Sequence, residues 1–301
     1  MLILFGLAKK QIGGMLEPAV ASAFDGAAGP WATTGGLPPG DVVFNPGLPS
    51  SVTLLSSWTA AVGFMAQLYA DFSGYTDIAL GLGLLVGIEL PPNFRLPFLA
   101  RSPIDFWSRW HISLSSWLRD NLYLPLAVRG GTPSAAGAIV VTMVLAGLWH
   151  GPSWTFAVWG LYHALLIMAA WAMGRLSKEW PRALLATRWM TAVKIGLTFL
   201  LMSVGDTLFR AVDMRSAGVM LRAMMGLSSI PSTFSYADAL AIVGVLLGLV
   251  VPHMMDARLL ELRRGGTPVR WRTFVPVAVG ILLFLLGTGG TGEGFYFYAQ
   301  F

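Results

Sequence analysis

Long apolar runs separated by short polar segments dominate this chain. Seven runs stand out: Val52–Ala70, Ile78–Leu90, Ala135–Trp149, Trp154–Met173, Met190–Val204, Ala239–Met255 and Phe274–Gly290. A helix that crosses a bilayer needs about 20 residues, so we expect the shorter runs to be tilted, re-entrant or buried behind others. None alternates like a barrel strand, and an open sheet could not satisfy its backbone in lipid. The pattern predicts an all-α, polytopic integral membrane protein, with one helical bundle domain over residues 1–301.

The segment Glu89–Arg129 departs from this pattern because it is amphipathic. It contains five arginines, and its aromatic residues include one phenylalanine and three tryptophans close together: Arg95, Arg101, Arg109, Arg119, Arg129, Phe106, Trp107, Trp110 and Trp117. Such a mixture suits the headgroup level of a membrane or a re-entrant position. An ordinary interfacial helix is the alternative interpretation.

Basic residues gather in two of the connections and predict an orientation. The connection 175–188 carries Arg175, Lys178, Arg182 and Arg188, and the connection 258–272 carries Arg258, Arg263, Arg264, Arg270 and Arg272. The positive-inside rule makes both connections cytoplasmic. We therefore expect the cation-free tail up to Phe301 and the Gly/Pro-rich stretch Gly29–Pro49 to lie outside.

Composition supports lipid as the surrounding solvent. Only 12% of the 301 residues are charged, 55% are hydrophobic and mean hydropathy is +0.66, whereas a soluble domain carries about 25% charged residues. The net charge is +5, and the basic residues lie in short loops between the apolar runs. The sequence has no basic stripe interleaved with exposed aromatic residues, so it gives no indication of a nucleic-acid partner. The absence of cysteine excludes a thiol nucleophile, a thiolate metal site and disulfides.

His150 is the sharpest candidate for chemistry. It stands between two apolar runs, directly before Gly151 and Pro152, and no formal charge occurs from Ala135 to Met173. A helix break opens the backbone to a substrate, and an imidazole that titrates near neutral pH can take a proton from a hydroxyl. The alternative is a histidine that forms a hydrogen bond with a neighbouring helix.

The other three histidines carry weaker signals. His111 lies on the amphipathic segment, His163 lies one helical turn after Trp159, and His253 lies beside a basic connection. We expect His163 to pack against Trp159 and His253 to be interfacial. The four histidines have no metal-ligand spacing and no acidic pair beside them, so we predict no metal site.

Acidic residues interrupt the first long apolar stretch. Asp71 and Asp77, with Ser73 and Tyr75 between them, fall inside Val52–Leu90. Carboxylates in an apolar stretch need a partner, for which Arg109 or Arg119 is a candidate. A plain loop between two helices is the alternative.

Four motifs in this order resemble the membrane-bound O-acyltransferase family. They are Asp71-Phe-Ser-Gly-Tyr-Thr-Asp-Ile-Ala, Pro92-Asn-Phe, Asp105-Phe-Trp-Ser-Arg-Trp-His-Ile-Ser-Leu-Ser-Ser-Trp-Leu-Arg-Asp and Gly147-Leu-Trp-His-Gly. They are most similar to the bacterial branch that contains alginate O-acetyltransferases and D-alanyl transfer proteins. The family's invariant histidine falls on His150 and its second histidine on His111.

This resemblance implies acyl transfer in a bacterial inner membrane. The acetyl donor would be cytoplasmic acetyl-CoA or a similar thioester, with no bound cofactor, and the acceptor would be the hydroxyls of an exported polysaccharide, reached through periplasmic partner proteins. His150 would act as general base, and His111 with Arg109 would orient the donor or stabilise developing charge. We expect supporting or substrate-binding roles for Arg109, Trp110, Trp149, Asp71, Asp77 and Asp120. An acyl-enzyme on Ser113 or Ser115 is alternative chemistry.

Other functions stay open at this point. The transferred group could be D-alanyl or another acyl group. The family's first helices have no counterpart in this sequence, so we expect the 301-residue chain alone to be inactive, and an inactive scaffold is one rival. A transporter is another, although the sequence shows no repeated halves with paired broken helices.

Overall fold

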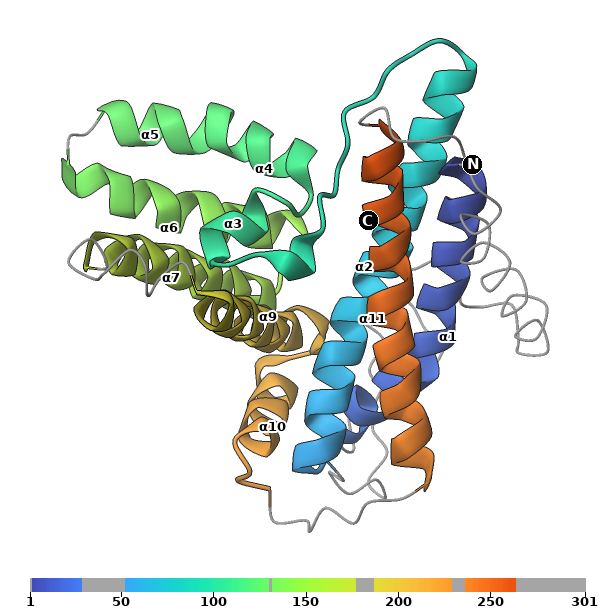
Figure 1. Cartoon of the computed structure of the whole chain (residues 1–301). Helices are drawn as coiled ribbons and strands as arrows, with labels where there is room; N and C mark the ends of the chain where they lie inside the picture. Colours follow the sequence, from blue (N-terminus) through green and yellow to red (C-terminus); the bar gives the residue numbers. More distant parts are fainter. Residues whose placement is uncertain (1, 29–51, 130–131, 177–186, 229–235, 264–301) are drawn as a thin grey trace. The chain divides into compact units, whose positions relative to one another are not determined.

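The computed structural model describes residues 2–28, 52–129, 132–176, 187–228 and 236–263 (Figure 1). These residues form helices and no strand, which confirms the all-α prediction. The helices are α1 (Leu2–Ala28), α2 (Leu54–Leu85), α3 (Pro103–Trp107), α4 (Ile112–Leu118), α5 (Leu124–Arg129), α6 (Thr132–Trp149), α7 (Trp154–Leu176), α9 (Arg188–Arg210), α10 (Met214–Met224) and α11 (Tyr236–Arg263).

The chain divides into two compact units. Unit 1 comprises the described residues of Met1–Pro91 and Arg210–Phe301, and unit 2 comprises those of Pro92–Phe209. The single domain expected over residues 1–301 stays a prediction.

Three helices of the described residues are long and apolar enough to cross a membrane. They lie at Trp154–Leu176, Arg188–Arg210 and Asp238–Leu259, and Ala135–Trp149 is a shorter apolar helix. A membrane protein with several spans is thus confirmed. The run 274–290, the stretch 29–49, Phe301 and much of both basic connections lie outside the described residues, so the orientation stays a prediction.

Unit 1 contains α1, α2 and α11 side by side (Figure 1). Helix α2 begins with a capping box, in which the Thr53 hydroxyl accepts from the Ser56 N–H at 3.1 Å and the Ser56 hydroxyl accepts from the Thr53 N–H at 2.9 Å. It then continues without a break past Asp71 and Asp77. The alternative of a loop at these aspartates is therefore wrong.

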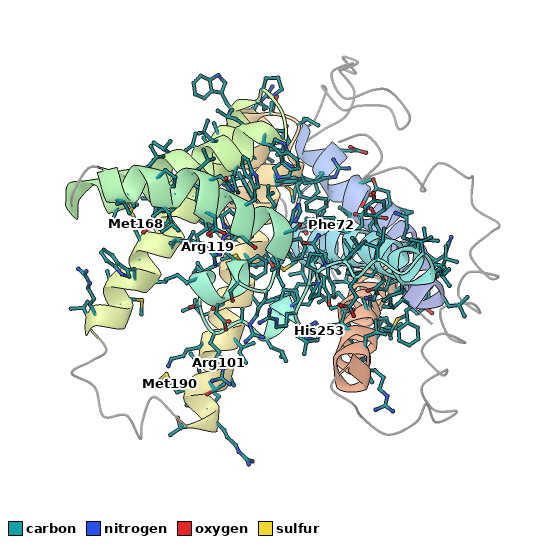
Figure 2. The ribbon with its side chains drawn as sticks, turned by 90° about the horizontal axis from the view of Figure 1, so that it is seen from above. Phe72, Arg101, Arg119, Met168, Met190 and His253 are labelled. Atoms are coloured by element: carbon teal, nitrogen blue, oxygen red, sulfur yellow. The ribbon has the colours of Figure 1, made fainter. Side chains whose placement is uncertain are left out.

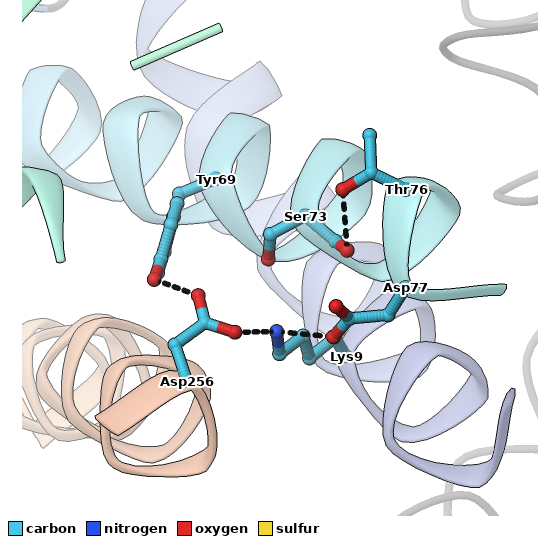
Figure 3. A network of polar contacts seen from close by, with 6 residues as sticks. All are labelled: Lys9, Tyr69, Ser73, Thr76, Asp77 and Asp256. Carbon is cyan, nitrogen blue, oxygen red and sulfur yellow. Dashed lines mark hydrogen bonds and ion pairs between the residues drawn. The ribbon is translucent and has the colours of Figure 1, made fainter. Parts of the chain in front are cut away.

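Lysines of α1 explain why α2 continues through its aspartates. Lys9 Nζ lies 2.6 Å from Asp77 Oδ2 and also contacts Asp256 Oδ1 of α11 (Figure 3). Lys10 pairs with Asp71. The suggested partners were wrong, because Arg109 pairs with Asp105 and Arg119 with Asp120. Paired charges can stay inside an apolar bundle, whereas an unpaired carboxylate would require the chain to leave it.

Helices α1 and α2 lie close enough for the lysines of α1 to contact the aspartates of α2. A Cβ on Gly74 of α2 would lie 2.6 Å from the carbonyl oxygen of Gly6 in α1, so the two backbones touch at this point. Small residues allow such an approach in membrane helices. The apolar-run pattern did not predict α1 as a long helix, because Lys9 and Lys10 interrupt its apolar run.

Unit 2 contains a hairpin of α6 and α7 that presents His150 at its turn. A Cβ on Gly147 would collide with the carbonyl of Phe156, and one on Gly160 with the carbonyl of Met143, so only glycine permits this approach. Helix α9 joins α7 through Tyr162, whose hydroxyl donates to the Leu201 carbonyl at 2.8 Å.

The amphipathic segment of unit 2 is a series of short helices. A 3₁₀ turn at Pro97–Leu99 and helix α3 precede α4, and one π-helical turn at Arg119–Tyr123 joins α4 to α5. Pro125 accounts for the wider turn, because its ring clashes with the carbonyl four residues earlier and it has no N–H to donate. Arg101 and Arg119, labelled in Figure 2, are exposed, and Phe106 is buried. The membrane depth of this segment stays a prediction.

Candidate active site

His150 lies in the turn between α6 and α7. Its backbone N–H donates to the Gly147 carbonyl at 2.9 Å, which ends the ladder of α6. The next helix begins after Pro152, where the Ser153 hydroxyl accepts from the Thr155 N–H at 3.3 Å. The helix break inferred from Gly151 and Pro152 is therefore present, and it places the imidazole between two helix ends.

Aromatic rings surround the His150 imidazole. Its centroid lies 4.7 Å from that of Phe209, 4.9 Å from Trp149, 5.7 Å from Trp159 and 6.0 Å from Phe156. Burial among these rings lowers the pKa of His150 from the ordinary 6.5 to about 4. The imidazole is thus uncharged near pH 7, with a lone pair on one ring nitrogen.

His111 begins helix α4 in a left-handed conformation, with φ of 44° and ψ of 55°. This conformation is uncommon outside glycine and persists where surrounding contacts hold it. The contacts come from Asn93, whose Oδ1 lies 3.3 Å from His111 Nδ1 and whose carbonyl accepts from the Ile112 N–H at 2.9 Å. Sequence reasoning quoted Asn93 within a motif without giving it a role.

His150 lies close enough to His111 to affect its pKa. Burial is the larger cause that lowers the pKa of His111 to about 4, and repulsion from His150 in its protonated form is the second. They are far apart in sequence but belong to the same unit. Unit 2 therefore holds two neighbouring imidazoles, both uncharged near pH 7.

Arg109 and Trp110 fix the backbone that leads into His111. Arg109 Nε donates to Asp105 Oδ1 at 2.6 Å, and its Nη1 donates to the Arg95 carbonyl at 3.3 Å. The Trp110 ring is buried and stacks on Phe106 at 5.5 Å with an interplanar angle of 15°. These contacts give both predicted residues a place beside His111, while their roles toward substrate stay predictions.

Three of the remaining predicted residues form ion pairs. Asp71 and Asp77 belong to unit 1, where lysines pair with them, and Asp120 forms an exposed pair with Arg119. Trp149 contacts His150, although 62% of its surface is exposed. Phe156, Trp159 and Phe209 complete the aromatic surroundings of His150; they carry no polar signal that sequence reasoning could have used.

The other two histidines differ from this pair. His163 is buried, with its ring 4.7 Å from Trp159, which confirms the expected packing. His253 belongs to α11 in unit 1, with its ring 6.0 Å from that of Tyr69. Within the described ranges no three His, Asp or Glu side chains are grouped as metal ligands.

A match to a known protein family covers the part of the chain that contains His111 and His150. Residues 50–204 match the membrane-bound O-acyltransferase family. A protein of Azotobacter vinelandii named "Probable alginate O-acetylase AlgI" is 43% identical over 176 residues, which cover 58% of this chain and 34% of that protein. The peptidoglycan O-acetyltransferase of Helicobacter pylori is 34% identical over 189 residues, covering 60% of this chain and 34% of that protein.

A third relative carries a different acyl group in its name. The teichoic acid D-alanyltransferase of Bacillus subtilis is 32% identical over 155 residues, which cover 49% of this chain and 39% of that protein. The matched part of the chain thus spans little more than a third of the length of these relatives.

Proposed function

We propose that this protein is an O-acyltransferase, because the chain belongs to the membrane-bound O-acyltransferase family. The observation that carries the proposal is the pair of uncharged imidazoles in unit 2, one at an uncharged helix break and one on a strained residue. Perturbed titratable groups that converge in this way are typical of functional sites.

In this proposal His150 is the general base. Its unprotonated ring nitrogen takes the proton from an acceptor hydroxyl while the hydroxyl oxygen attacks the thioester carbonyl. The tetrahedral intermediate then expels the thiolate of the donor, and this thiolate takes the proton from the His150 imidazolium. A base in this role typically accelerates transfer about 10²- to 10⁴-fold. The rings of Trp159 and Phe209 cover part of the His150 imidazole, which would limit the access of water that hydrolyses the thioester.

His111 orients the reactants beside His150, and Arg109 and Trp110 hold the backbone of His111 in place. This division follows the contacts of Arg109, whose guanidinium is engaged by Asp105 and the Arg95 carbonyl. An arginine held in this way contributes position more than charge to the site.

The finer proposal concerns the reactants. The donor is a cytoplasmic acyl thioester such as acetyl-CoA, and the acceptor is a hydroxyl of an exported polysaccharide, reached through periplasmic partner proteins at the bacterial inner membrane. Similarity to an alginate O-acetylase and a peptidoglycan O-acetyltransferase favours acetyl transfer to a polysaccharide. Similarity to a teichoic acid D-alanyltransferase keeps D-alanyl transfer as the second candidate.

Replacing His150 with alanine tests the proposal. In native membranes of cells that carry the full-length enzyme, we expect transfer of labelled acetyl from acetyl-CoA to fall at least about 100-fold, with unchanged protein level. His253→Phe is the matched control, because it removes an imidazole from unit 1 and should leave transfer near wild type. Retention of more than about a tenth of the activity in His150→Ala would contradict the general-base role.

A further inference from the structure

The side chain of Asn93 contacts both His111 and Ser113. Its Oδ1 accepts from the backbone N–H of Ser113 at 3.1 Å and from the Ser113 hydroxyl at 2.9 Å, and it lies 3.3 Å from His111 Nδ1. Asn93 is itself buried. Three polar groups from the start of α4 therefore share one oxygen atom.

The hydrogen bond from the Ser113 N–H shows that the oxygen of the Asn93 amide, and not its nitrogen, faces α4. A backbone N–H can only donate, so its partner must be the acceptor oxygen and not the amide nitrogen. His111 Nδ1 contacts the same oxygen, which offers no proton. The Nδ1 atom must therefore carry the proton, and in an uncharged ring the lone pair is then on Nε2.

We propose that Asn93 is a positioning residue of the transfer reaction: its Oδ1 holds His111 in the Nδ1-protonated tautomer, with Nε2 as the hydrogen-bond acceptor. The kinetic consequence rests on the proposed function, whereas the tautomer itself does not. A second contact supports this arrangement. The backbone carbonyl of Asn93 accepts from the Ile112 N–H and so holds the His111 backbone in its left-handed conformation.

The tautomer limits what His111 can do. Nε2 can accept a hydrogen bond from a hydroxyl or an N–H of a reactant, but it cannot donate one to a developing oxyanion. It also argues against Ser113 as a nucleophile activated by His111. Nδ1 lies 3.5 Å from the Ser113 hydroxyl but is already protonated, and that hydroxyl donates to Asn93. The ligand group that His111 selects is thus a hydrogen-bond donor, such as an N–H or a neighbouring hydroxyl of a reactant, because the attacking hydroxyl gives its own proton to His150.

Nitrogen NMR of ¹⁵N-histidine-labelled full chain in detergent tests the tautomer directly, since protonated and unprotonated ring nitrogens have well-separated shifts. The His111 signal is identified by its loss in His111→Gln. Near pH 7 we expect protonated Nδ1 and unprotonated Nε2. A protonated Nε2 in the wild-type protein would overturn the inference, whatever the transfer activity is. Transfer that does not need His150 would instead contradict the proposed function.

Two variants test the role of Asn93. Asn93→Ala removes the acceptor, so we expect mixed tautomers and a transfer rate lower by about 10- to 100-fold. Asn121→Ala is the matched control, because the exposed Asn121 amide only donates to the Trp117 carbonyl. Asn93→Asp keeps an acceptor oxygen and adds a negative charge.

The pH profile of Asn93→Asp separates positioning from simple structural support. A carboxylate beside Nδ1 favours the imidazolium of His111, so the acid limb of the rate should move to higher pH than in wild type. Among the described residues, His150 is a titratable group that also acts on His111. An unmoved acid limb in Asn93→Asp, or an unchanged His111 tautomer in Asn93→Ala, would overturn the proposal.

Discussion

The buried polar network of unit 1 and the two candidate histidines of unit 2 differ in charge. Unit 1 buries full charges and pairs them across α1, α2 and α11, with Lys9 completely buried between Asp77 and Asp256 and the Tyr69 hydroxyl donating to Asp256 (Figure 3). Unit 2 places His150 among aromatic rings and His111 against an asparagine, and burial keeps both uncharged near neutral pH.

The difference separates a structural use of polar groups from a chemical one. A buried ion pair whose members satisfy each other has little capacity left for a substrate, and it fixes which helices meet. An uncharged imidazole keeps a lone pair that can accept a proton. We therefore expect damage to unit 1 to appear as lost stability and damage to unit 2 as lost transfer.

The largest effect on stability should follow from Lys9→Met. The change leaves two buried carboxylates without their shared cation, which should cost about 3–5 kcal/mol of unfolding free energy. Thermal unfolding in detergent measures it. Arg119→Met is the control, because the Arg119–Asp120 pair is more than half exposed and should change nothing measurable. Equal stability of Lys9→Met and wild type would remove the structural role of the network.

Tyr69→Phe should have a smaller effect of the same kind. It removes only the hydroxyl that donates to Asp256, and loss of a hydrogen bond to a buried charge costs about 1.5–3 kcal/mol. Tyr75→Phe on the same helix is the matched control, because the Tyr75 side chain is 56% exposed. If both variants unfold at the same temperature, the Tyr69 contact contributes nothing to unit 1.

The smallest effect concerns pH and unit 2. A lowered pKa means that the proton is lost at lower pH, so the base form of His150 persists down to about pH 4. Initial transfer rates should therefore be nearly constant between about pH 7.5 and 5.5 and fall only below that range. A rate that halves near pH 6.5 would show that His150 titrates as an exposed histidine does.

More of the site in unit 2 than of the ion pairs in unit 1 could be predicted from the sequence. The uncharged run that ends at Trp149 and the Gly-Pro after it located the helix break at His150, because composition and turn chemistry are local. The partners of Asp71 and Asp77 were misassigned to arginines, because the pairing of α1 with α2 depends on contacts between distant segments. Asn93 escaped notice for the same reason, since its partners lie about twenty residues later.

Measuring transfer and thermal unfolding together on His150→Ala and Lys9→Met separates the chemical role of His150 from the structural role of Lys9. We expect His150→Ala to unfold like wild type but to transfer at least about 100-fold more slowly. We expect Lys9→Met to lose stability, while the fraction that remains folded keeps the wild-type rate. A His150→Ala protein that still transfers, or a fully folded Lys9→Met protein that does not, would contradict this division of roles.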